Sequence, residues 1–404
     1  MVEVRTIVMS PHVNHAVVDG QMVLFSHADR YPRLLNATAA HIFLLAGSPI
    51  AELDIVEAVA RAHAVATLDV AADVCGVLDA LIDDDLCRLV ESQVEADAPL
   101  PTPRRSLNPP ATAIGPIMAL GTRLFIDVPT AYPELREQLS NAVDPLRSLD
   151  LRSDRGDIVV RIDVNGAAWT IFANDTPVTT VGSPVECRRM VLSLLNTLPL
   201  ELVEDGVVLH AASARVNGMG VVFPGDSGAG KSTIVAQLIA RGHGYLTDEA
   251  VVIDLRDLVA EPFPKSLRIE PGAQRLLSHL EPHDSELRDA SWDVDPRSIE
   301  PASIAGRASI ERIVFPQYRK GVRRAVLRRV QPVDALLRLL RATFDFRASG
   351  QEGFGALARL AESVPAYELL HSGHGQLEAV ETLASPAATG GSPADRRTGE
   401  PRLG

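Results

Sequence analysis

The sequence predicts a protein of two folded domains that combine α-helices with β-strands, an α+β or α/β architecture whose second domain contains a mixed β-sheet. Three observations support this prediction. The chain has 404 residues, which exceeds one typical domain. A proline-rich stretch at residues 93–112 separates two regions in which strand and helix patterns follow each other. In the second region an apolar strand runs through a glycine-rich turn directly into a helix.

The composition excludes some classes of partner. The formal net charge of −13 and an isoelectric point near 5.3 argue against a nucleic-acid binder, since the clustered basic residues occupy only one segment, 319–329. Cys75, Cys87 and Cys187 show no paired or metal-ligand spacing, which favours the reduced cytoplasm. No stretch approaches the roughly 18 apolar residues that a membrane span needs. We expect a soluble, cytoplasmic protein without nucleic-acid or membrane partners.

Residues 1–92 predict a small first domain. Residues 13–25 alternate as two short strands around Asp19-Gly20, a dipeptide suited to a tight hairpin turn. Asn36 is a typical helix N-cap and precedes an apolar helical stripe. The pattern then predicts two further helices and a last short strand, at residues 51–62, 70–83 and 86–91.

That order, with the wording Leu-Leu-Asn-Ala-Thr-Ala-Ala-His-Ile-Phe-Leu-Leu-Ala-Gly around Asn36, resembles the PqqD-like peptide-recognition domains. These are small winged-helix-like modules that hold the leader of a ribosomally made precursor peptide for a modifying enzyme. The resemblance implies that such a peptide adds a strand to the edge at residues 17–25, beside the helix at residues 70–81. The alternative is a small structural or dimerising domain that binds no peptide.

Residues 113–384 form the second predicted domain, and residues 385–404 a disordered tail. The strand at residues 207–216 reaches an Asn217-Gly218 turn and returns as the strand that feeds the glycine-rich turn. The feeding strand should therefore pair antiparallel with its predecessor, in a mixed sheet. Further strands are expected at 123–128, 158–164, 168–172, 310–315 and 365–370, and further helices at 133–149, 186–198, 333–344 and 354–363.

The glycine-rich turn matches the phosphate-binding pattern G-x-x-x-x-G-K-[ST]. The strand before it and the helix after it agree with that setting, since backbone N–H groups and the helix N-terminus then converge on phosphate oxygens. Lys231 is expected to reach the outer phosphates of ATP, and Ser232 to bind Mg²⁺. Residues 205–255 are therefore the nucleotide core, whose loop consists of Gly225, Asp226, Ser227, Gly228, Ala229, Gly230, Lys231, Ser232 and Thr233.

Other polar side chains are expected near this loop. His210 lies in the strand before it, and Asp248 and Glu249 lie where two later strands meet. Phosphoryl transfer needs a base for the accepting hydroxyl, which a carboxylate near the terminal phosphate can supply. The acidic pair can instead serve only as a Mg²⁺ ligand, and His210 can be structural. Lys265 and Arg268 in a later loop are candidates for binding a phosphate or a substrate carboxylate; the alternative is a solvated loop.

Three segments together are similar to the C-terminal half of the HPr kinase/phosphorylase family. They are the strand end Leu-His-Ala-Ala, the glycine-rich loop and the segment Thr-Asp-Glu-Ala-Val. That fold groups with phosphoenolpyruvate-carboxykinase-like phosphate-loop proteins. The resemblance implies that His210 lies beside the catalytic site and that Asp248 is the base in the kinase direction. It implies Mg²⁺ bound by Ser232 and Glu249. Related kinases are oligomeric, so it also implies a homo-oligomer.

This chain departs from that family at particular positions. Thr233 stands where the family has a glutamate after the loop serine, and Glu249 stands where it has an aspartate. The sequence shows no counterpart of the loop associated with the reverse, phosphorolytic reaction, which leaves that reaction open. These traits fit the HPr-kinase-related proteins found beside peptide-modification genes.

The two domains together predict a kinase that uses ATP and Mg²⁺ to phosphorylate a Ser or Thr hydroxyl on a ribosomally made precursor peptide. A leader-binding module tethered to a catalyst raises the local concentration of the segment to be modified. One alternative is an ABC-like or other phosphate-loop ATPase, which the absence of a Leu-Ser-Gly-Gly-Gln segment disfavours. Another is an ATP-gated peptide chaperone that transfers nothing, which Thr233 leaves open. The sequence identifies neither the acceptor nor the donor among ATP, ADP and pyrophosphate.

Overall fold

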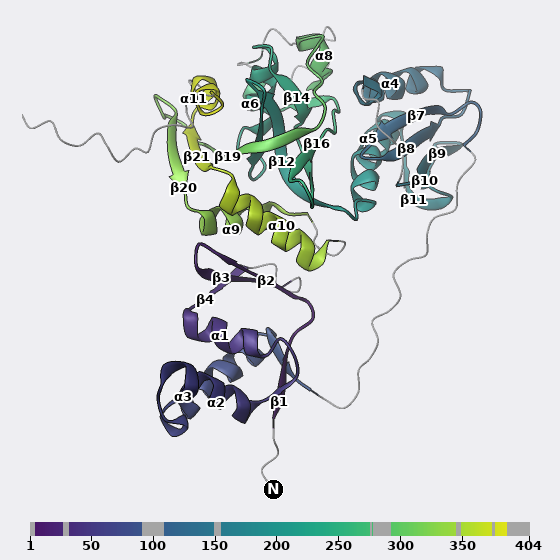
Figure 1. The fold of residues 1–404 in the computed structure, drawn as a ribbon. Coiled ribbons are helices and arrows are strands. Elements are labelled where there is room, and N and C mark those ends of the chain that lie inside the picture. The colour runs from purple at the N-terminus through teal and green to yellow at the C-terminus, as the bar shows by residue number, and fades with distance from the viewer. Residues whose placement is uncertain are drawn as a thin grey trace, which may run out of the picture.

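The structure is a computed structural model in which helices and strands alternate in three parts (Figure 1). Two of its sheets have both parallel and antiparallel neighbours, so the predicted mixture of helices with a mixed sheet is confirmed. None of the described helices has the length and apolar character needed to cross a lipid bilayer. Most of the predicted linker and nearly all of the predicted tail lie outside the described residues, which are 5–26, 32–90, 109–148, 155–274, 277, 292–344, 349–373 and 376–385.

The first part contains three helices and two small sheets. Its elements are β1 (Thr6–Met9), β2 (Val13–Val18), β3 (Gln21–Ser26), β4 (Pro32–Leu35), α1 (Ala37–Leu45), β5 (Ile50–Ala51), α2 (Glu52–His63), α3 (Thr67–Asp83) and β6 (Cys87–Leu89). The strand orders are β5-β1-β6 and β2-β3-β4, with all pairs antiparallel. A core of apolar side chains from both sheets and all three helices holds this part together, including Ile7, Leu24, Phe43, Ile55 and Leu78.

Local sequence signals account for the predicted hairpin and helix start. Asp19 and Gly20 both have positive φ, at 50° and 74°, as a tight turn between β2 and β3 requires. The side chain of Asn36 accepts a hydrogen bond from the N–H of Ala39 at 2.9 Å and so caps α1. Both predictions are confirmed. The short strands β1 and β4 were not predicted, because four residues carry too little periodicity.

The prediction of an open strand edge at residues 17–25 is wrong for residues 21–25, which lie in β3. Strand β3 is the central strand of its sheet and pairs with β2 on one side and β4 on the other. Strand β2 is the edge strand, and this edge is occupied at His15, because the side-chain amide of Gln351 accepts from the N–H of His15 at 3.0 Å and donates to its carbonyl at 2.7 Å. The helix expected beside that edge, α3, packs against α1 and α2 instead.

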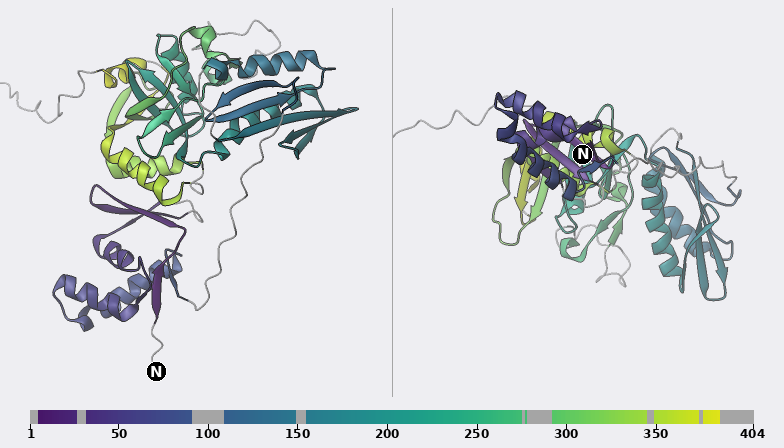
Figure 2. Two further views of the ribbon diagram at one scale, coloured as in Figure 1. Left: turned by 45° about the vertical axis from the view of Figure 1, so that its right-hand side comes forward. Right: turned by 90° about the horizontal axis from the view of Figure 1, so that it is seen from below.

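The second part is a five-stranded sheet with helices on one face (Figure 2). Its elements are β7 (Ile114–Ala119), β8 (Thr122–Asp127), α4 (Pro133–Val143), the 3-10 helix η1 (Asp144–Ser148), β9 (Asp157–Asn165), β10 (Ala168–Ala173), β11 (Thr176–Val181) and α5 (Pro184–Glu201). The order is β11-β10-β9-β8-β7, and only β8 and β9 are parallel. Alternate residues of β9, Ile158, Val160 and Ile162, are buried with α4 and α5.

The third part contains the eight-stranded mixed sheet. Its first half consists of β12 (Gly206–Val216), β13 (Met219–Pro224), α6 (Lys231–Ile239), β14 (Gly244–Thr247), β15 (Ala250–Asp254), β16 (Val259–Glu261) and β17 (Leu267–Ile269). Its second half consists of α7 (Pro271–Gln274), β18 (Trp292–Val294), α8 (Pro296–Ile299), β19 (Ala308–Tyr318), β20 (Val326–Val330), α9 (Pro332–Ala342), α10 (Gly350–Ser363), β21 (Ala366–His371) and α11 (Gln376–Leu383).

The topology of this sheet agrees with the prediction for the strand that enters the loop. Strand β13 pairs antiparallel with β12 and parallel with β19, and β19 is in turn parallel to β21. Helices cover both faces: α6 and α11 lie on one, and α9 and α10 on the other. The carboxyl ends of β13, β19 and β21 therefore meet at one edge of the sheet, where α/β proteins commonly bind ligands.

The first part packs on the helices α9 and α10 of the third part (Figure 1). The hairpin side chains Val18, Val23 and Phe25 belong to the same buried cluster as Phe354 and Leu357 of α10. The β2-β3-β4 sheet is thus buried on one face by α1 and on the other by α10. An apolar contact of this kind fixes the first part relative to the phosphate-loop sheet.

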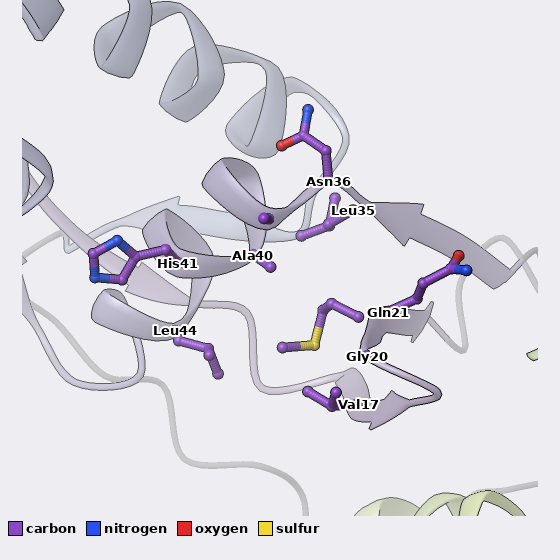
Figure 3. Close-up of a pocket in the computed structure, with 10 residues that line it drawn as sticks. Val17, Gly20, Gln21, Leu35, Asn36, Ala40, His41 and Leu44 are labelled. Carbon is purple, nitrogen blue, oxygen red and sulfur yellow. The ribbon is translucent and has the colours of Figure 1, made fainter. Parts of the chain in front are cut away.

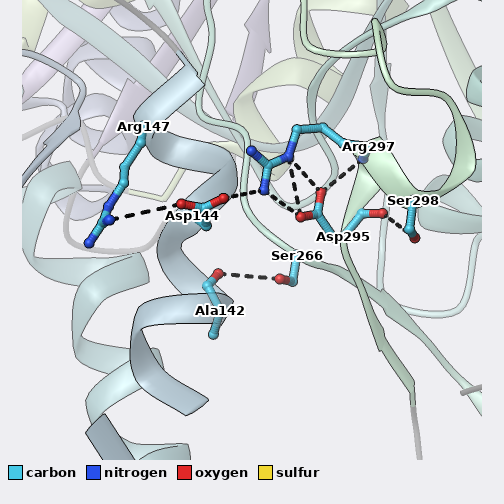
Figure 4. A network of polar contacts seen from close by, with 7 residues as sticks. All are labelled: Ala142, Asp144, Arg147, Ser266, Asp295, Arg297 and Ser298. Carbon is cyan, nitrogen blue, oxygen red and sulfur yellow. Dashed lines mark hydrogen bonds and ion pairs between the residues drawn. The ribbon is translucent and has the colours of Figure 1, made fainter. Parts of the chain in front are cut away.

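A polar network joins the second and third parts (Figure 4). The guanidinium of Arg297, on α8, lies 2.6 Å from carboxylate oxygens of both Asp144 and Asp295. Hydrogen bonds to these two carboxylates raise the pKa of Arg297. Nearby, the Ser266 hydroxyl donates to the carbonyl of Ala142 at 3.3 Å. The network anchors the segment that begins directly after Lys265 to the second part.

Candidate functional site

The glycine-rich loop has the geometry of a phosphate cradle. It connects the end of β13 to the start of α6, and Gly228 and Gly230 have positive φ of 81° and 92°. Gly230 is the N-cap of α6 and provides no side-chain cap, so the first N–H groups of the helix stay available for an anion. Asp226, Ser227 and Gly228 are exposed. These observations fit the binding of nucleotide phosphates.

Lys231 is buried beneath the loop. Its ammonium group donates to the carbonyls of Gly225 at 2.6 Å and Asp226 at 3.0 Å, and lies 3.0 Å from Nε2 of His210. Burial lowers the pKa of Lys231, although Asp226 and Asp248 oppose this effect. Lys231 thus ties the loop to the end of the neighbouring strand, at His210.

His210 connects the loop to the acidic pair. Its carbonyl accepts from the N–H of Gly225 at 3.5 Å, and the next residue, Ala211, donates its N–H to the carbonyl of Glu249 at 3.2 Å. Burial and the ammonium of Lys231 lower the pKa of His210, so at neutral pH the ring is uncharged and Nε2 accepts the Lys231 hydrogen bond. The ring of Phe344 stands edge-on to the imidazole, with the centroids 5.5 Å apart.

The acidic pair is held by a lysine. Asp248 and Glu249 lie between β14 and β15, and the ammonium of Lys265 is 3.4 Å from Oδ1 of Asp248 and 2.7 Å from Oε2 of Glu249. Only 2% of the Asp248 side chain is exposed, compared with 51% of the Glu249 side chain. Lys265, which the sequence proposes as a phosphate or substrate ligand, therefore lies inside the site as the counter-ion of both acids.

The charges of this cluster stabilise one another. Burial lowers the pKa of Lys265, but the two carboxylates outweigh it and leave that pKa raised. Burial likewise raises the pKa of Glu249, but the ammonium of Lys265 outweighs it and leaves that pKa lowered. Lys265 therefore remains protonated and Glu249 ionised at neutral pH.

Tyr245, on β14, is a site residue that sequence reasoning missed. Its hydroxyl lies 3.1 Å from Oδ1 of Asp248 and 3.1 Å from the carbonyl of Lys265. Complete burial raises its pKa well above the usual value, so it remains a neutral donor. The tyrosine and Lys265 both contact Oδ1, while Oδ2 makes no hydrogen bond or ion pair with the described residues. The sequence feature that could have indicated this role is a tyrosine two residues before the end of the strand that leads to Asp248.

His371 is a second residue that was missed. It ends β21 and is only 2% exposed, and its Nε2 lies 3.2 Å from the carbonyl of Ala229 in the loop. A Cβ on Gly230 would approach its Cε1 to 2.9 Å, which explains why only glycine fits there. The predicted strand at 365–370 ends just before His371. A residue at the carboxyl end of a strand is a candidate for a binding site, and this position could have indicated its role.

The remaining predicted residues lie farther from this cluster or at its margin. Arg268 on β17 is exposed and pairs with Glu270 at 3.3 Å, although its charge still contributes to lowering the pKa of Glu249. Thr233 lies in the first turn of α6. Within the described part of the chain, no group of three His, Cys, Asp or Glu side chains forms a metal site. The hydroxyl of Ser232 and the carboxylate of Glu249 offer the oxygen ligands that Mg²⁺ prefers, and Mg²⁺ usually takes few protein ligands.

Comparisons with known proteins point to one family of kinases. No family model matches the chain. The HPr kinase/phosphorylase of Limosilactobacillus reuteri (strain DSM 20016) is 32% identical over 85 residues, which are 21% of this chain and 26% of the relative. That of Ralstonia pickettii (strain 12J) is 32% identical over 113 residues, 28% of each chain. That of Enterococcus faecalis (strain ATCC 700802 / V583) is 35% identical over 99 residues, 24% of this chain and 31% of the relative.

Among solved structures, the Hpr(Ser) kinase/phosphatase from Coxiella burnetii aligns with 44% of this chain and 93% of its own, at 16% identity and a TM-score of 0.25. The chain spans about a quarter of the length of the first two curated relatives. The similarity in sequence therefore concerns one region of these enzymes, and it agrees with a phosphate-loop kinase.

Proposed function

We propose that this protein is a phosphotransferase that uses ATP and Mg²⁺ to phosphorylate a Ser or Thr hydroxyl on a ribosomally made precursor peptide. One observation carries the proposal: Lys231 of the loop contacts His210, and Ala211, the next residue, hydrogen-bonds to Glu249 of the acidic pair. A carboxylate beside the loop can hold Mg²⁺ in any phosphate-loop protein, but phosphoryl transfer to a hydroxyl also needs a group that accepts the proton. Oδ2 of Asp248 suits that role, because Tyr245 and Lys265 both contact Oδ1.

Each residue has a role that its contacts support. The loop N–H groups and Lys231 bind the phosphates, and His210 positions the Lys231 ammonium. Asp248 accepts the proton of the attacking hydroxyl at Oδ2, because Tyr245 and Lys265 both contact Oδ1. Mg²⁺, when bound by Ser232 and Glu249, would neutralise charge on the phosphates. Lys265 keeps the two neighbouring carboxylates from repelling each other.

The N-terminal part is proposed to hold the peptide leader, as its resemblance to PqqD-like domains implies. It carries a pocket of about 460 Å³ between the β2–β3 turn and α1 (Figure 3). Val17, Met22 and Leu44 supply apolar walls, and His41 also lines the pocket. Val17 is 55% and Leu44 48% exposed, which suits the binding of an apolar side chain. We propose this pocket, in place of strand addition at residues 21–25, as the leader site.

One experiment separates the possible activities. The purified chain is incubated with γ-labelled ATP, Mg²⁺ and the short peptide encoded beside its gene. A kinase transfers the label to a Ser or Thr of the peptide; an ATPase releases it as inorganic phosphate; an ATP-gated chaperone does neither. Lys231→Ala should weaken both nucleotide binding and transfer. Label found only in inorganic phosphate, at a rate the peptide does not change, would refute the proposed transfer.

A further inference from the structure

An exposed basic surface lies on this otherwise acidic protein. The turn at residues 319–325 between β19 and β20, here named the basic turn, and the strand that follows it carry six cations in eleven residues: Arg319, Lys320, Arg323, Arg324, Arg328 and Arg329. All six are exposed. Within the described part of the chain no acidic side chain pairs with any of them, whereas the chain as a whole has a net charge of −13. Unpaired like charges at this density repel one another, and an anionic partner would relieve this repulsion.

The basic turn adjoins the phosphate loop through His371. The N–H of Arg319 donates to the carbonyl of His371 at 2.7 Å, and the His371 ring contacts the carbonyl of Ala229 in the loop. The Ser372 hydroxyl also donates to the carbonyl of Val322 inside the turn, at 2.5 Å. Strands β13, β19 and β21 are parallel, so the loop, the basic turn and His371 all lie at the carboxyl edge of the sheet.

Protection of the sheet edge explains only part of this surface. Strand β20 is the last strand of its sheet, and charges on an edge strand such as Arg328 and Arg329 discourage pairing with other chains. Arg329 also packs over the ring of Tyr367, 5.3 Å from its centroid. The four cations of the turn lie outside the strand and have no edge to protect. Their position beside the loop favours a ligand that arrives with the acceptor.

We propose that the basic turn is a docking surface for an acidic stretch of the peptide that carries the accepting hydroxyl. This proposal rests on the proposed function, because the acceptor must reach the carboxyl edge of the sheet. The chemistry is charge complementarity: Asp or Glu side chains flanking the hydroxyl would contact Arg319, Lys320, Arg323 and Arg324. A nucleic acid is disfavoured, because the surface is short and the net charge of −13 opposes a long polyanion.

Binding of a labelled probe tests this surface without any phosphoryl transfer. The probe is a fluorescein-labelled nonapeptide with one Ser flanked by glutamates, and its neutral counterpart has glutamines in their place. Fluorescence anisotropy with the full chain should show tighter binding of the acidic probe, weakened by added salt. Arg323→Glu with Arg324→Glu should weaken it about tenfold. Arg61→Glu with Arg189→Glu, exposed and remote from the turn, changes the net charge equally and should preserve binding.

Three outcomes would overturn the proposal. They are equal binding of the acidic and neutral probes, equal loss in the two double variants, and tighter binding of a labelled hexathymidylate than of the acidic peptide. Nucleotide binding by the Arg323→Glu/Arg324→Glu variant, measured with a fluorescent ATP analogue, should be unchanged and shows that the variant is folded. Arginine-dependent probe binding without phosphate transfer would support the docking surface while refuting the proposed kinase. Phosphate transfer at the same rate to peptides with and without acidic residues would support the proposed kinase while refuting the docking surface.

Discussion

The ammonium group of Lys265 lies between the carboxylates of Asp248 and Glu249, 3.4 Å from the first and 2.7 Å from the second. Two adjacent acids repel each other, and the side chain of Asp248 is only 2% exposed. The positive charge of the lysine offsets this repulsion. This ion pair is therefore the feature on which the charge state of the whole site depends.

Removal of that lysine should destabilise the fold. Lys265→Met leaves Asp248 buried without its counter-ion, and breaking a buried ion pair in this way costs about 3 kcal/mol. We expect this loss in the free energy of unfolding, measured by urea denaturation. Lys320→Met removes an exposed lysine and should have no measurable effect. Equal stability of the two variants would mean that the Lys265 pair does not form.

Gly230 should be required for nucleotide binding. Gly230→Ala adds a Cβ at 2.9 Å from the His371 ring, at a φ of 92° that strains any residue other than glycine. Gly242→Ala, at a φ of 83° with open space around it, is the matched control. Both variants should lose about 1 kcal/mol of stability. Only Gly230→Ala should bind a fluorescent ATP analogue about tenfold more weakly.

The protein should lose stability in mild acid through its buried histidines. Burial lowers the pKa of both His210 and His371, so below about pH 6.5 the unfolded chain takes up protons that the folded chain excludes. The unfolded state then binds more protons, and the free energy of unfolding falls as the pH falls from about 7 to about 5. His371→Asn should flatten this pH dependence, whereas His63→Asn on the surface should not. The melting temperatures of the unmodified protein and of the two variants, measured from about pH 7 to about pH 5, test this prediction.

Gln351 should seal the edge of β2. Its side chain occupies the outward N–H and carbonyl of His15, so Gln351→Ala frees both backbone groups. We expect faster hydrogen exchange of the His15 amide by mass spectrometry, with exchange in α3 unchanged. Glu352→Ala, at the neighbouring exposed position, is the control and should leave the His15 amide protected. Unchanged exchange in the Gln351 variant would show that this contact does not protect the edge.

The features that sequence predicted well are local. The Asp19-Gly20 turn, the Asn36 cap and the phosphate loop each depend on a few consecutive residues, and all three adopt the expected conformation. The antiparallel pairing of β13 with β12 was predicted from one further local feature, the Asn217-Gly218 turn between them. Such signals act through backbone preferences that hold in any surroundings.

The features that sequence missed or misplaced depend on distant partners. Gln351 closes the edge of β2 from 336 positions away, and His371 contacts the loop from 142 positions away. The sequence predicts that Lys265 lies in a loop that is solvated or binds a ligand. Nothing near Lys265 in the sequence shows that β14 and β15 bring the acidic pair to it. Tertiary packing, which periodicity does not encode, decided these contacts.

Asp248 provides the most direct test of the whole account. The variant Asp248→Asn keeps the size and the Tyr245 contact of the side chain but removes the base. Phosphate transfer from labelled ATP to the peptide encoded beside the gene is measured in single turnover, together with the affinity for ATP. The account predicts that transfer falls at least about 100-fold while ATP binding stays near that of the unmodified protein. Transfer at the normal rate by Asp248→Asn would contradict it.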